Sequence, residues 1–396
     1  MIKHIFFSAM FITCALMAMS ELAIAEDPVV PEPFQRFNAS SDYTINYEDL
    51  STFLAAMVID TGRSNREKAT STSAKTGTRM KTNVNRLTVN EGNRFYFEAF
   101  EDDENIRHLL GNLQRSLEQI PTEVPLEYFS RDEQLAYWLN LYNFTVLNEI
   151  TRIYPKRNLK KLLVGKNSIL SNKLLTVAGI PLSLNDIQFT ILKQNYKNNP
   201  LIMYGLYQGI IGGPNIRKRA YTGENVYRNL VDNAIEFVNS NRGTYIHKSK
   251  VFRVSSLYER NKAYFSDFNP DLAEHLLHYL EGAERGELQA ATKVTADIDD
   301  WTVTDLYGTY HEIGGSLADN SAALIDSVSS SGMTNSFTST GYLEKAGNKS
   351  RFSAQMIEQL EKLSRRNAVS NAEKVPEKAG APDQVSDDPE KNKKKH

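Results

Sequence analysis

The sequence predicts an α+β protein: a single, predominantly helical domain with a few short strands or hairpins and a disordered C-terminal tail. Apolar residues recur at helical spacing in several separate segments, whereas segments typical of strands are few and short. Hydrophobic residues make up 41% of the 396 residues, enough for a sizeable core. The composition turns to Ser, Gly and charged residues after Gly308, so we expect the globular domain at residues 43–308.

Capping residues and apolar spacing predict the elements in order. Ser130, Ser183 and Thr222 stand where helix N-caps are expected. Pro121 and Pro125 are expected to end the helix that precedes Ser130. The predicted helices are Tyr47–Val58, Asn105–Ile120, Ser130–Ile150, Ser183–Lys193, Thr222–Val238 and Asn269–Leu280. The predicted strands are Phe95–Phe100, a pair within Lys173–Leu182 and a hairpin within Tyr245–Ser255, while Pro200–Pro214 is expected to be a buried strand or helix leading into a glycine turn.

The N-terminus has the pattern of a secretory signal peptide over residues 1–25. A short positive stretch precedes an apolar run, Ile5–Met19, and Ala23-Ile24-Ala25 offers a cleavage site. We expect a periplasmic or extracellular protein without an integral membrane segment after signal removal, because the run is shorter than the ~20 residues of a span. The other expected segments are an extended one at 26–42, a Ser/Gly-rich linker at 309–350, a lone helix at 351–366 and a disordered charged tail at 367–396.

Cysteine usage and net charge exclude several classes of function. Cys14 is the only cysteine and lies in the signal segment, so the mature chain has no disulfide, thiolate nucleophile or cysteine metal ligand. The net charge of −2 gives no electrostatic case for nucleic-acid binding. His275 and His278 lie one turn apart without a third ligand at a fixed spacing, so we expect neither a metal nor a cofactor.

The segment Ser130–Ile150 is apolar nearly all the way round a helix, yet it carries Asn140 and Asn143 one turn apart. Buried amides need partners, because an unpaired one costs about 1–3 kcal/mol. With Tyr142, these amides would either line a pocket for a polar ligand or tie the helix to neighbouring loops.

Several motifs together resemble the family called domain of unknown function 547, in a secreted bacterial branch. The branch is indicated by the Thr61-Gly62 turn, Thr76–Arg79 and Glu91–Arg94. The motifs that carry the family resemblance are Glu133–Phe144 (EQLAYWLNLYNF), Gly179–Gln188 (GIPLSLNDIQ), Gly212–Thr222 (GGPNIRKRAYT), Ser255–Phe268 and Asp300-Trp301. The resemblance covers about residues 43–308 and implies no established reaction.

The chain departs from the family pattern at two places. Many members have a cysteine before the glycine turn, where this chain has Tyr207 and Gln208, and some have Glu-His where it has Gln188 and Phe189. Chemistry that depends on those groups in a relative is therefore missing here.

The remaining candidate residues each allow a binding and a structural interpretation. The glycine turn with Gln208 and Arg217 would either cradle an anion or pack closely, and Glu91 and Arg94 would form either a site pair or a structural ion pair. The basic segment Thr61–Arg86 would either bind phosphate-rich headgroups or be a solvated loop. It contains no aromatic residue for base stacking.

These features favour a non-enzymatic envelope or extracellular binding module, with an envelope component or a small polar ligand as its partner. The alternative is a hydrolase or transferase that acts on an envelope polymer or peptide without cysteine chemistry. The chain has neither a Gly-x-Ser-x-Gly nor a His-Glu-x-x-His motif.

Overall fold

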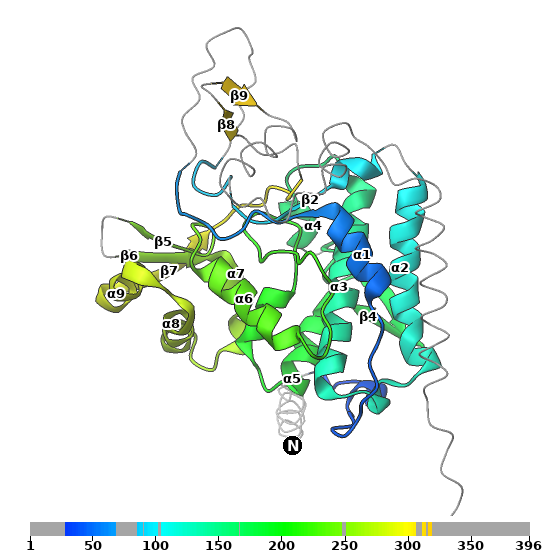
Figure 1. The fold of residues 1–396 in the computed structure, drawn as a ribbon. Coiled ribbons are helices and arrows are strands. Elements are labelled where there is room, and N and C mark those ends of the chain that lie inside the picture. The colour runs from blue at the N-terminus through cyan, green and yellow to red at the C-terminus, as the bar shows by residue number, and fades with distance from the viewer. Residues whose placement is uncertain are drawn as a thin grey trace, which may run out of the picture.

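Helix α3 (Arg131–Ile153) runs through the centre of the protein, as the computed structural model shows (Figure 1). Ser130 caps it as expected, because its hydroxyl accepts a hydrogen bond from the backbone N–H of Glu133 at 3.2 Å. Nearly every residue of α3 from Glu133 to Thr151 is buried, so the helix is packed on all sides. This explains why its sequence lacks a polar face.

The structure describes residues 28–68, 85–89, 91–101, 104–165, 167–247, 251–305, 311–313 and 316–318. The predicted signal peptide, lone helix and charged tail lie outside these residues, as do most of the predicted linker and of the basic segment. The part of the linker that is described pairs β8 (His311–Ile313) with β9 (Ser316–Ala318). No helix within the described ranges is long and apolar enough to cross a membrane.

Helices α1 (Glu48–Met57) and α2 (Glu104–Glu123) cover α3 on one side of the molecule (Figure 1). Phe53 of α1 packs against Phe144 of α3 with the ring centroids 5.7 Å apart. α2 continues through Pro121, although a proline was expected to end it. Proline removes the donor for the carbonyl four residues earlier, and the hydroxyl of Tyr137 donates to that carbonyl, of Leu117, at 3.1 Å.

A three-stranded sheet lies on the other side of the molecule (Figure 1). β5 (Thr244–His247) and β6 (Val251–Ser255) form the expected hairpin, and β7 (Lys293–Ile298) joins β6 in parallel. Three helices accompany the sheet: α7 (Ser256–Arg260), α8 (Phe268–Tyr279) and α9 (Gly282–Ala290). α6 (Val226–Val238) connects this half to α3, since it contacts both α3 and α8.

Short elements complete the fold. The predicted hairpin at residues 173–182 is present as β3 (Lys173–Val177) and β4 (Ile180–Ser183), which turn at Ala178 and Gly179. A π-helix, Asp186–Leu192, then leads into α5 (Lys193–Asn195), and α4 (Lys160–Leu163) lies between α3 and β3. Single 3-10 turns are formed by Glu32–Phe34, Leu126–Tyr128 and Lys262–Tyr264.

One predicted strand takes a different form. Only Arg94 and Phe95 form a strand, β2, which pairs with β1 (Val58–Ile59), and Phe97–Phe100 is a 3-10 helix. The aromatic residues at positions 95, 97 and 100 are all fully buried in the core. Pro200–Pro214 was expected to be a buried strand or helix, and Pro200–Gly205 is a buried 3-10 helix followed by extended chain into the glycine turn.

The segment 300–305 closes the core by bonding to three distant parts of the chain. Its backbone pairs with Phe95, with Arg157 and Leu159 after α3, and with the glycine turn at Gly209 and Ile211. All of these hydrogen bonds are between 2.8 and 3.0 Å long. The helical α+β class predicted from the sequence is therefore confirmed, with short sheets at its edges and a core that spans both halves.

Candidate functional site

A polar cleft of about 700 Å³ lies between residues 60–63, the loop after the glycine turn and one face of α6. None of its lining residues is aromatic, and they are mainly charged or asparagine. Five cations face three carboxylates, so the lining carries an excess of positive charge. The lining residues are Ala55, Asp60, Gly62, Arg63, Asn93, Asn215, Arg217, Lys218, Arg219, Asn225, Arg228, Asn229, Asp232, Asn233 and Glu236.

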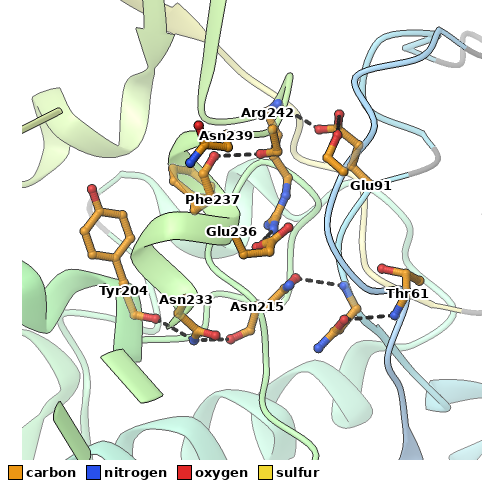
Figure 2. A network of polar contacts seen from close by, with 12 residues as sticks. Thr61, Glu91, Tyr204, Asn215, Asn233, Glu236, Phe237, Asn239 and Arg242 are labelled. Atoms are coloured by element: carbon orange, nitrogen blue, oxygen red, sulfur yellow. Dashed lines mark hydrogen bonds and ion pairs between the residues drawn. The ribbon is translucent and has the colours of Figure 1, made fainter. Parts of the chain in front are cut away.

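A chain of amides holds the walls of the polar cleft together. The side chain of Asn233 donates to the backbone carbonyls of Tyr204 at 2.9 Å and Asn215 at 3.1 Å. The Asn215 side chain accepts from the backbone of Asn93 at 2.8 Å, and the Asn93 side chain accepts from the backbone of Thr61 at 3.1 Å. Figure 2 shows this chain of contacts from Tyr204 to Thr61. The three walls are therefore fixed relative to one another.

Arg217, a residue selected from the sequence, lies in the polar cleft and is held there by α6. Its guanidinium donates to the side-chain oxygens of Asn229 at 2.9 Å and Asn233 at 3.2 Å. Its nearest carboxylate, that of Asp232, is 3.8 Å away and half exposed. Neutral amides thus position Arg217 and leave most of its charge available to a ligand.

A buried cluster of Glu91, Arg242 and Glu236 backs the polar cleft (Figure 2). Glu91 accepts hydrogen bonds from the backbone N–H groups of Asn241 and Arg242, each at 2.9 Å, and from the Ser64 hydroxyl at 2.7 Å. The Arg242 guanidinium, only 1% exposed, donates to one oxygen of Glu236.

Glu236 is the most unusual group in the polar cleft. Burial raises the pKa of its carboxyl group, and the charges of Glu91 and Asp60 raise it further, while the adjacent Arg242 opposes the shift. Its side chain is 10% exposed, and its second oxygen, Oε1, has no hydrogen-bond partner among the described residues. The cleft therefore contains a buried acceptor that its own protein groups leave unused.

Two further arginines line the cleft without a counter-ion. Arg219 and Arg228 are exposed, and neither forms an ion pair within the described part of the chain. Arg63, by contrast, is paired with Glu281 at 3.3 Å.

Asn140 and Asn143 bond to backbone and line neither this cavity nor the second one described below. The amide of Asn140 bonds to both the carbonyl and the N–H of Tyr221 at 2.8 and 2.9 Å. The amide of Asn143 donates to Gly205 and accepts from Tyr207, both at 2.9 Å. The two residues attach α3 to the chain on either side of the glycine turn.

The positions that depart from the family pattern lie near one another. Gln208, 5% exposed, accepts from the Arg260 guanidinium at 3.0 Å, and Arg260 interacts electrostatically with Tyr142. Tyr264 donates to the backbone of Gln188 at 2.8 Å and interacts with Tyr142. Burial raises the pKa of Tyr142, and its hydroxyl has no partner within the described ranges. The side chains here are amides, phenols and a guanidinium.

Arg94 is not part of the polar cleft. Its guanidinium donates to the backbone carbonyls of Val89 at 2.6 Å and Glu91 at 3.2 Å, so the two charged side chains do not pair directly. Burial lowers the pKa of Arg94 to about 10, although Asp305 and Asp300 partly offset the shift.

A second cavity of about 630 Å³ contains His275 and His278. The ring of His275 stacks on Tyr204, and its Nε2 lies 2.9 Å from the Tyr204 hydroxyl. Burial lowers the pKa of His275 to about 4. Among the described residues, no group of three or more His, Cys, Asp or Glu side chains is arranged to hold a metal.

The fold and the cleft define a helical α+β protein with a polar, ligand-sized cavity. Residues 126–238 match the family model described as "Protein of unknown function, DUF547", so the family identified from the motifs is confirmed over this segment. The matched segment contains α3, the loop after the glycine turn and α6, and the last two of these supply most of the cleft lining. No curated protein and no solved structure matches the chain.

Most of the cleft residues are not among those predicted from the sequence. They include Asp60, Asn229, Asn233 and Glu236, although asparagines at 225, 229 and 233 repeat every four residues on an otherwise amphipathic helix. That repeat was a usable signal, because it places three amides on one face.

Proposed function

We propose that this protein is a non-enzymatic binding module of the bacterial envelope or extracellular space, and that the polar cleft binds a small anionic ligand. One observation carries the proposal: Arg219 and Arg228 line the cleft without a counter-ion, beside an Arg217 fixed by neutral amides. Guanidinium groups arranged in this way suit carboxylate and phosphate groups.

Inorganic phosphate is a direct probe of the anion site. We expect phosphate to raise the melting temperature saturably at constant ionic strength. The Arg219→Gln/Arg228→Gln variant should bind phosphate at least tenfold more weakly, since hydrogen bonds to charged groups contribute about 1.5–3 kcal/mol each. The matched control is Arg36→Gln/Arg152→Gln, which removes two exposed arginines outside the cleft. Equal binding by both double variants would contradict the proposal.

The proposed location rests on the signal-like residues 1–25. Expression of the full chain in a Gram-negative host followed by fractionation should yield a periplasmic protein whose N-terminus is Glu26. Retention of Met1 in the cytoplasmic fraction would contradict it.

A second candidate is a hydrolase or transferase acting on an envelope polymer or peptide. Glu236 favours it, because a carboxyl group with a raised pKa in a cleft is suited to donate a proton. Incubation with purified cell-wall fragments and mass spectrometry of the products tests this reading. Product formation that is lost in Glu236→Gln would support the enzyme over the binding module.

A further inference from the structure

The charges on α6 are ordered along the polar cleft. Arg228, Asp232 and Glu236 follow one another at intervals of four residues, and all three line the cavity. The helix therefore presents a cation at its N-terminal end and carboxylates towards its C-terminal end. Asp60 adds a second negative charge near Glu236, with which it interacts electrostatically.

The carboxylates at the acidic end of the cleft can accept hydrogen bonds from a ligand. Oε1 of Glu236 is buried without a hydrogen-bond partner, and Arg242 contacts only the other oxygen. Asp60 accepts from the backbone of Gly62 at 2.9 Å, so it retains acceptor capacity on the wall formed by residues 60–63, which differs from the α6 wall that carries Glu236. A ligand ammonium group would supply hydrogen bonds to both carboxylates and reduce their mutual repulsion.

The spacing of the charges sets the length of the ligand. Arg228 and Glu236 are eight residues apart on α6, which corresponds to about 12 Å along the helix axis. An extended peptide spans about 3.3–3.6 Å per residue, so three residues cover about 10 Å, and a flexible arginine side chain covers the difference. A single amino acid is too short to reach both ends.

We propose that the polar cleft binds a short peptide of about three residues, with its ammonium group at Glu236 and Asp60 and its carboxylate at Arg228 and Arg219. The inference rests on the proposed anion-binding function and adds the chemical class of the ligand. Asn229, Asp232 and Asn233 line the cleft between the two ends, where the peptide backbone would lie.

Isothermal titration calorimetry with trialanine tests the inference on the full mature chain. We expect trialanine to bind at least tenfold more tightly than N-acetyl-trialanine, trialanine amide or alanine, because each of these lacks one of the two charged contacts or the span between them. Glu236→Gln should weaken trialanine binding tenfold or more and leave phosphate binding within twofold.

Glu236 is paired with Arg242, so Glu236→Gln must be checked by circular dichroism. Asp60→Asn offers a second variant on the opposite wall and should also weaken trialanine binding. Glu259→Gln removes an exposed carboxylate outside the cleft and is the matched control.

The possible results separate the two proposals. If N-acetyl-trialanine binds as tightly as trialanine, the ammonium contact is wrong and the anion site stands. If phosphate binds and no form of trialanine does, the peptide assignment is wrong. If neither phosphate nor trialanine binds, the proposed function fails together with the inference.

Discussion

The side-chain amide of Asn140 pairs with the backbone of Tyr221 through two hydrogen bonds, donating at 2.8 Å and accepting at 2.9 Å. The Asn140 side chain therefore bonds to the Tyr221 backbone as one peptide group bonds to another in a sheet, although here it joins a helix to a loop. Both residues are only 2% exposed, so water cannot replace either bond. Helix α3 is thereby joined to the chain that enters α6.

Asn140→Ala should lower the free energy of unfolding by about 2–4 kcal/mol, because it leaves a buried N–H and a buried carbonyl unpaired. Urea denaturation measures the change. Asn269→Ala, at an exposed position of α8, should change the value by less than about 0.5 kcal/mol. A small effect at Asn140 would mean that the loop finds other partners.

Two glycine substitutions should have opposite effects. A Cβ at Gly243 would lie 1.8 Å from the backbone oxygen of Phe237, so Gly243→Ala should destabilise the fold by more than about 3 kcal/mol. Gly286 lies within α9 with nothing within 4 Å of its Cβ position, and Gly286→Ala should stabilise by about 0.5–1 kcal/mol. Thermal unfolding of both variants measures the direction of each change in stability. A stable Gly243→Ala protein would contradict the close contact between Gly243 and the backbone of Phe237.

Protonation of His275 should destabilise the protein in acid. Its folded-state pKa of about 4 lies below the ordinary value of 6.5, so between these values the unfolded chain binds more protons than the folded one. Stability should therefore fall as the pH drops from 6.5 to 4, by about 3 kcal/mol in total. His275→Phe keeps a ring beside Tyr204 and should show a shallower pH dependence. Parallel curves for the two proteins would contradict the shift.

Glu91→Gln should weaken the contact between residues 61–68 and the end of α6. The carboxylate accepts from two backbone N–H groups and from Ser64, and an amide would place its own N–H₂ group against one of these donors. We expect a loss of about 1–3 kcal/mol in urea denaturation and faster proteolysis near Ser64. Glu67→Gln, an exposed change in the same segment, is the control.

The sequence was informative where a pattern is local. The helices around Ser130, Thr222 and Asn269 and the hairpin at 173–182 follow from spacing and turn residues, and all are present. The parallel pairing of β7 with β6 joins residues about 40 positions apart, so no local sequence pattern predicts it. Continuation of α2 through Pro121 depends on the Tyr137 hydroxyl, which no pattern within α2 reveals.

The candidate site was predictable only in part, because its walls come from three separate stretches of chain. Arg217 could be selected from the basic loop after the glycine turn, whereas Asp60 and Glu236 become neighbours only through the fold. Asn140 and Asn143 were conspicuous since polar residues interrupt an apolar helix, but that signal reports burial and not ligand contact.

The position of the segment 300–305 also determines when folding can finish during synthesis. Phe95, Leu159 and Ile211 each need a backbone partner from this segment, and all three precede it by roughly 90 residues or more. A nascent chain that has not yet produced residue 305 therefore leaves three stretches of its interior backbone without their hydrogen bonds. Completion of the core is a late event that one short stretch of backbone brings about for both halves at once.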